Sequence, residues 1–104
     1  MPLDIAIFDQ PEKNYLDYLP LSISIHTNLI QLSKKLNLTL IYQMSEYYSD
    51  VEYSIDKLHD LKIEIENLLQ INNLNKDTKN FLENFKKLLI KAQELKKPIS
   101  VVAD

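Results

Sequence analysis

The chain has 104 residues, of which 45% are hydrophobic and 26% are charged, and its formal net charge is −3. This length and balance are typical of one globular domain with a hydrophobic core, so we expect a single domain over residues 1–104. Because the chain contains neither cysteine nor glycine, disulfides, thiolate nucleophiles, cysteine-based metal sites and glycine-rich phosphate loops are excluded.

Charge and hydropathy also indicate in which cellular compartment the protein resides and which partners it can bind. No apolar run approaches the roughly 20 residues that span a bilayer, and the opening segment MPLDIAIFDQ lacks the basic region of a signal peptide. We therefore expect a cytoplasmic protein with no membrane partner. All 12 basic residues are lysine, and arginine is the residue that most often reads bases and grips phosphates, so direct binding of DNA or RNA is not expected.

Two strands are predicted near the start of the chain. The segments 3–7 (LDIAI) and 21–25 (LSISI) both alternate apolar residues with small or polar ones, which is the period of a half-buried strand. The residues between them include Pro11 and Pro20, which favour a turn or loop. The pattern therefore predicts an antiparallel hairpin with a long connection.

An amphipathic helix is predicted next. From His26 to Asn37, leucines recur at spacings of three and four, and lysines occupy the opposite side. The following segment 38–43, LTLIYQ, is rich in β-branched and aromatic residues, but its periodicity does not separate a loop from a short helix.

Two longer helices and a final strand complete the predicted elements. Residues 55–68 carry a helical apolar stripe that Ser54 can cap, and a third helix begins at Asp77 or Thr78 with a stripe of its own. These two helices should pair antiparallel. The segment 99–103 (ISVVA), which follows a helix-ending proline, has strand composition and is placed against the hairpin. The expected fold is a two-layer α+β domain with helices on one face of a sheet.

Residues with catalytic potential are few and isolated. His26 and His59 have no metal-ligating or acid–base partner at a useful spacing, and Ser54 with Lys57 spells an SxxK motif where a helix cap already explains the serine. The lysines of the third predicted helix are most simply a solvated face. We therefore expect a protein that is not an enzyme and that uses no metal or cofactor.

The segment SEYYSDVEYS, residues 45–54, is the strongest candidate for a binding surface. No lysine lies between Lys35 and Lys57, so acidic residues and tyrosines gather there without a base to neutralise them. Tyrosine is enriched at the centres of protein interfaces, and neighbouring acids attract a basic partner. Alternatively, some of the rings point inward and fill the core. The predicted partner-binding residues are Glu46, Tyr47, Tyr48, Asp50, Glu52 and Tyr53.

Three short motifs, PLDIAIFD, SEYYSDVEYS and PISVVAD, are spread over most of the chain. Through them the chain resembles the small bacterial immunity proteins of contact-dependent growth inhibition and polymorphic-toxin systems. The resemblance implies a stoichiometric toxin inhibitor that needs no catalytic residues, with a cognate toxin domain, often a basic nuclease, as its partner.

A second class of function agrees with the same residues. A small regulatory or scaffold protein, acting through protein–protein binding or through dimerisation of its paired helices, would show the same lack of catalytic motifs. The identity of the neighbouring genes separates the two classes, because an adjacent toxin gene favours immunity and an operon of metabolic enzymes favours regulation.

Overall fold

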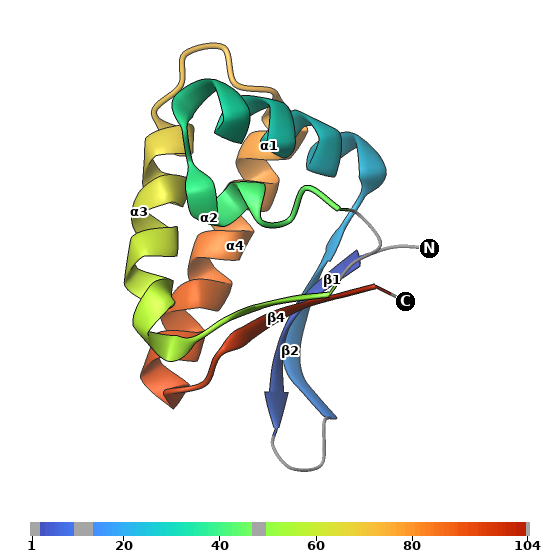
Figure 1. The fold of residues 1–104 in the computed structure, drawn as a ribbon, viewed down its shortest axis with the longest axis vertical. Coiled ribbons are helices and arrows are strands. Elements are labelled where there is room, and N and C mark those ends of the chain that lie inside the picture. Colours follow the sequence, from blue (N-terminus) through green and yellow to red (C-terminus); the bar gives the residue numbers. More distant parts are fainter. Residues whose placement is uncertain (1–2, 10–13, 47–49, 104) are drawn as a thin grey trace.

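The computed structural model describes residues 3–9, 14–46 and 50–103 and shows the predicted α+β architecture (Figure 1). In these residues four strands form one sheet, and the helices gather on one side of it. The elements in chain order are β1 (Leu3–Asp9), β2 (Asn14–Leu21), α1 (Ile23–Leu36), α2 (Thr39–Tyr42), β3 (Val51–Tyr53), the 3-10 helix η1 (Ile55–Lys57), α3 (Leu58–Leu69), α4 (Lys76–Leu95) and β4 (Ile99–Ala103).

The strand order in the sheet is β2-β1-β4-β3, and every neighbouring pair is antiparallel. The register places Ile5 of β1 between Leu19 of β2 and Val101 of β4. The C-terminal strand therefore pairs with the N-terminal hairpin, as the sequence predicted. It also separates β1 from β3, so strands from both ends and from the middle of the chain meet in one sheet.

The second strand lies earlier in the chain than the sequence predicted. β2 spans Asn14–Leu21, and the LSISI segment begins helix α1 instead of forming a strand. Ser22 explains the switch, because its hydroxyl oxygen accepts a hydrogen bond of 3.3 Å from the backbone N–H of Ile25 and caps the helix. Pro20 is tolerated in β2 because this strand lies at the edge of the sheet.

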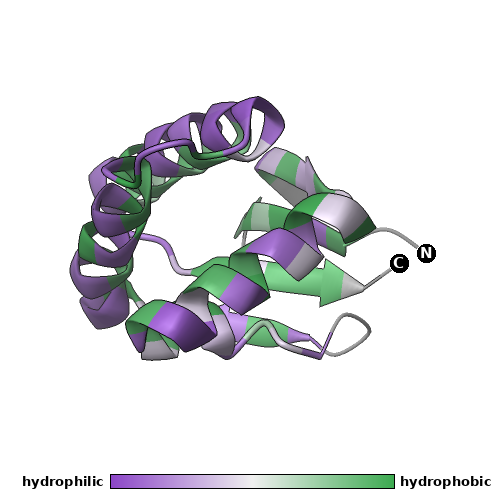
Figure 2. Ribbon diagram, turned by 90° about the horizontal axis from the view of Figure 1, so that it is seen from above, coloured by the Kyte–Doolittle hydropathy of each residue, from purple (hydrophilic) through white to green (hydrophobic). Residues whose placement is uncertain are grey.

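The core fills the space between the helices and one face of the sheet. α3 and α4 lie side by side, and α1 crosses near one end of this pair (Figure 1). Seen from above, the hydrophobic sides of the helices turn toward the sheet and the hydrophilic sides turn outward (Figure 2). Within α4, the rings of Phe81 and Phe85 meet edge to face at 5.8 Å between their centroids.

Helix ends are formed without glycine. The N-cap of α4 is Asn75, two residues before the predicted Asp77 and three before Thr78, and its side-chain oxygen accepts from the backbone N–H groups of both these residues. α1 and α4 end at Asn37 and Lys96, which take the left-handed conformation with φ of 59° and 55°. Glycine usually occupies this position, so Lys96, with its Cβ, takes it at an energetic cost.

The two ambiguous stretches of the sequence have definite structures where they are described. Residues 39–42 form the short helix α2, which was one of the two alternatives for that segment. The acidic stretch ends in strand β3, which the sequence analysis did not predict. The helix predicted over 55–68 begins as the 3-10 turn η1 and continues as α3. Ser54 precedes η1, but its side chain caps no backbone N–H there.

Candidate functional site: the outer face of the sheet

The sheet has two chemically different faces, because successive side chains of a strand point to opposite sides. Leu3, Ile5 and Ile7 of β1 point into the core beneath the helices. Their neighbours in β1 point the other way, and the register aligns them with residues of the other three strands. We call this second surface the outer face; it comprises Asp4, Ala6, Phe8, Tyr18, Pro20, Glu52, Ser100 and Val102.

One row of the outer face runs across all four strands. Glu52 of β3 lies opposite Ser100 of β4, Ser100 lies opposite Ala6 of β1, and Ala6 lies opposite Tyr18 of β2. The two residues in the middle of the row have small side chains, whereas Glu52 is exposed and the side chain of Tyr18 is 54% exposed. Ala6 itself is buried, so the exposed ends of the row are a carboxylate at one edge of the sheet and an aromatic ring at the other.

All the charged residues of the four strands are acidic. The four strands contain Asp4, Asp9, Asp17 and Glu52 and no lysine. Asp17 is neutralised on the side of the helices, where the ammonium group of Lys91 lies 3.2 Å from its carboxylate. Asp4 points to the outer face and is only 9% exposed. The outer face thus carries negative charge and no positive charge of its own among the strand residues.

A groove of about 310 Å³ opens on this face beside the edge strand β3. The side chains of Phe8 and Val102 supply apolar surface, and Asp50 and Glu52 supply exposed carboxylates. The residues lining the groove come from β1, β3, β4 and the residue before β3; they are Phe8, Asp50, Val51, Glu52, Ser100, Val101 and Val102.

The six predicted partner-binding residues have different positions. Glu46, Asp50 and Glu52 are exposed, and Asp50 and Glu52 line the groove. Tyr47 and Tyr48 lie outside the described residues.

Tyr53 does not belong to a surface. Its side chain is 1% exposed, and its hydroxyl donates a hydrogen bond to the backbone carbonyl of Leu40. Alternation along β3 points Glu52 outward and therefore points Tyr53 into the core. Burial, with a smaller contribution from the charge of Glu64, raises the pKa of the Tyr53 phenol. Its prediction as a partner-binding residue is therefore wrong, and the alternative of an inward ring is correct for this tyrosine.

The structure adds residues that the sequence analysis missed. Phe8 and Val102 lie beside Glu52 although they are far from it in the sequence. Alternation within LDIAIFD was a sufficient signal to place Phe8 opposite the core face of β1. The sequence placed the strand over 99–103 against the hairpin, but nothing local to the sequence indicated that β3 would pair with that strand.

Two of the residues considered for catalysis, His26 and Ser54, have structural partners. The Nε2 of the buried His26 lies 2.5 Å from the carbonyl oxygen of Met44, so this nitrogen carries the proton and donates it. The Ser54 hydroxyl donates to the exposed carboxylate of its near neighbour Asp56. Among residues 3–9, 14–46 and 50–103, no group of three or more His, Asp or Glu side chains is arranged to hold a metal ion.

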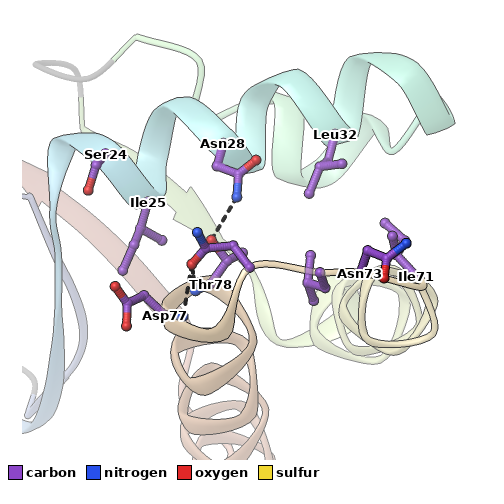
Figure 3. A pocket seen from close by; sticks show the side chains of 10 residues that line it. Ser24, Ile25, Asn28, Leu32, Ile71, Asn73, Asp77 and Thr78 are labelled. Carbon is purple, nitrogen blue, oxygen red and sulfur yellow. Dashed lines mark hydrogen bonds between the residues drawn. The ribbon is translucent and has the colours of Figure 1, made fainter.

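A second hollow, of about 430 Å³, lies between α1 and the turn that joins α3 to α4 (Figure 3). Its polar groups already have structural roles. The side-chain amide of Asn28 donates to the Thr78 hydroxyl at 2.7 Å and joins α1 to α4, and Asn75 caps α4. The hollow therefore looks like a junction between helices, and it brings together no charged pair and no nucleophile with a base.

Searches with the chain against protein-family models, curated proteins and solved structures found no match. The relationship to immunity proteins therefore rests on the short sequence motifs and stays a prediction. No helix in the described part of the chain is both long and apolar enough to cross a membrane.

Proposed function

We propose that this protein acts by binding, as a bacterial immunity protein that neutralises a cognate, basic toxin domain in the cytoplasm. The observation that carries the proposal is the outer face of the sheet, where Asp50 and Glu52 stand beside the apolar surface of Phe8 and Val102, with no lysine in any strand. Apolar area with acidic surroundings suits a partner whose own surface is basic.

The proposed mechanism needs no chemical step. A nuclease active site attracts phosphates through a basic groove, and an acidic protein surface laid over that groove replaces the nucleic acid. The negative charges of the outer face would speed the encounter by long-range attraction, and the apolar contacts would slow dissociation.

The lysines of this protein are compatible with such an encounter. The exposed lysines of α4 belong to the helix layer on the other side of the sheet, and two are neutralised where they stand. Lys86 pairs with Glu66 at 3.0 Å, and Lys91 pairs with Asp17. A basic partner that approaches the outer face therefore meets the acids of that face before it meets the lysines of α4.

The test first identifies a toxin gene beside the gene for this protein and then uses its product. The purified protein should inhibit the toxin at a ratio of one to one, and isothermal titration should give the same stoichiometry. Glu52→Gln should weaken this binding, whereas Glu83→Gln, which removes the same charge from the exposed surface of α4, should leave it unchanged. Full inhibition by a variant in which both Asp50 and Glu52 are neutralised would show that the outer face is not the contact surface.

A regulatory or scaffold protein is the second candidate, and exposed isoleucines on the helix layer favour it. Ile63 of α3 and Ile90 of α4 are 42% and 39% exposed, and apolar side chains on a helix pair suit a helical partner or a second copy. Light scattering after gel filtration distinguishes the two candidates. A stable dimer that dissociates on Ile63→Lys would support this second function.

A further inference from the structure

We infer that the groove beside β3 receives an arginine side chain of the basic partner. This inference rests on the proposed function, because it assigns the part of the partner that the outer face recognises. The groove is lined from three strands and from the residue before β3, and its lining includes the aromatic residue Phe8 and the exposed acidic residues Asp50 and Glu52.

The shape of the groove suits one long side chain. At about 310 Å³ it lies at the lower limit of typical ligand pockets, which range from roughly 300 to 1,000 Å³. It is lined by the edge strand β3, which has a neighbouring strand on one side only.

The chemistry of the groove is complementary to a cation that also has apolar surface. The methylene groups of an arginine can lie on Val102, and its planar guanidinium can stack on the ring of Phe8. The same guanidinium can donate hydrogen bonds to the carboxylate of Glu52 at the rim. The groove therefore offers apolar surface to the methylene groups of the arginine, and an aromatic ring and a carboxylate to its guanidinium.

Arginine suits this groove better than lysine. A guanidinium is planar, carries five donors and loses its hydration easily, whereas an ammonium group is a compact and strongly hydrated charge. The groove offers an aromatic ring, separated acceptors and the Ser100 hydroxyl, and only a forked, planar cation can contact all of them together.

The direct test is a nuclear magnetic resonance titration of the full-length, ¹⁵N-labelled protein with N-acetyl-arginine amide. The amide resonances of Val51, Glu52 and Val102 should shift and saturate. Acetyl-citrulline amide, which has the same shape and no charge, should cause no saturable shift. Acetyl-lysine amide should bind more weakly than the arginine probe.

Matched variants locate the binding. Glu52→Gln and Phe8→Leu should each weaken the arginine probe by about two- to fivefold, the range expected for an exposed cation–π or ionic contact. Glu83→Gln should bind like the parent protein. Because Phe8 is partly buried, the dispersion of the spectrum first verifies that Phe8→Leu folds, and Glu52→Gln serves as the independent variant.

The outcomes separate this inference from the proposed function. Equal binding of the citrulline or lysine probe, or shifts that map away from the groove, would overturn the assignment of arginine. If the toxin is neutralised while the arginine probe does not bind, the proposed function stands and the inference fails. If the probe binds in the groove and no basic toxin is neutralised, the inference stands and the proposed function fails.

Discussion

The hydroxyl of Tyr53 donates a hydrogen bond of 2.6 Å to the backbone carbonyl oxygen of Leu40. This bond joins β3 to α2 inside the core, where both residues are buried. Tyr53→Phe removes the hydroxyl donor, so the buried carbonyl of Leu40 loses this hydrogen bond. We therefore expect a loss of about 1–3 kcal/mol in the free energy of unfolding. Urea denaturation measures the loss. Weaker partner binding by the folded variant, at unchanged stability, would instead place Tyr53 at the interface.

The same phenol predicts how stability depends on alkaline pH. Burial raises its pKa in the folded state above the ordinary value of about 10, so the unfolded chain releases this proton first. The contribution of the Tyr53 phenol to the free energy of unfolding is therefore fully present below about pH 10. It declines as the pH rises further toward the pKa of the folded state. Denaturation series from pH 8 to about pH 11 should therefore show a steeper decline for the parent protein than for Tyr53→Phe. Parallel curves for the two proteins would contradict the prediction.

Glu64 of α3 holds the first turn of α2. Its two carboxylate oxygens accept hydrogen bonds of 3.1 and 3.0 Å from the backbone N–H groups of Leu40 and Ile41. Glu64→Ala should lower the free energy of unfolding by about 1.5–3 kcal/mol, because bonds to a charged acceptor are stronger than neutral ones. Glu83→Ala on the exposed side of α4 is the control and should change the unfolding midpoint little. Equal midpoints for both variants would mean that water replaces the Glu64 carboxylate at no cost.

Lys96 ends α4 with a φ of 55°, a conformation in which a Cβ is unfavourable. Lys96→Gly should raise the free energy of unfolding by about 0.5–1 kcal/mol. This gain is the backbone strain that glycine relieves, minus the cost of the greater flexibility of glycine in the unfolded chain. Lys96→Ala removes the same charge and keeps the Cβ, so it should give no gain. Thermal melting of the parent protein and the two variants measures the change in stability. An equal gain in stability for both variants would mean that the effect comes from loss of the lysine charge.

Asp50 and Glu52 should control the rate of encounter with a basic toxin. Neutralising both, by Asp50→Asn with Glu52→Gln, should slow association and flatten its dependence on salt, because screened long-range attraction no longer contributes. Stopped-flow measurements at several salt concentrations test this. A control protein with Asp60→Asn and Glu83→Gln, both exposed on the helix layer, keeps the total charge equal. An association rate that is the same in the two double variants would exclude a local effect of the outer face.

Local patterns in the sequence predicted the elements whose signals do not depend on neighbours. The apolar stripes of α1, α3 and α4 repeat at helical spacing over several turns, and β1 and β4 follow the period and composition of strands. β2 escaped prediction because a bulge opposite Ile7 and Phe8 shifts the phase of its alternation. LSISI was misassigned because Ser22 was read as part of a strand and not as a helix cap.

The sequence by itself determined the α+β class, the position of the strand at the end of the chain and the acidic bias of the first half, because these follow from periodicity and composition. Only the tertiary structure decided what the side chains of strand β3, at the end of the acidic stretch, face. Pairing of β3 with β4 sends Tyr53 into the core and Glu52 to the outer face, where it lines one groove with Phe8 of the N-terminal strand. Strand pairing joins residues that are distant in sequence, and no local pattern records which strands will meet.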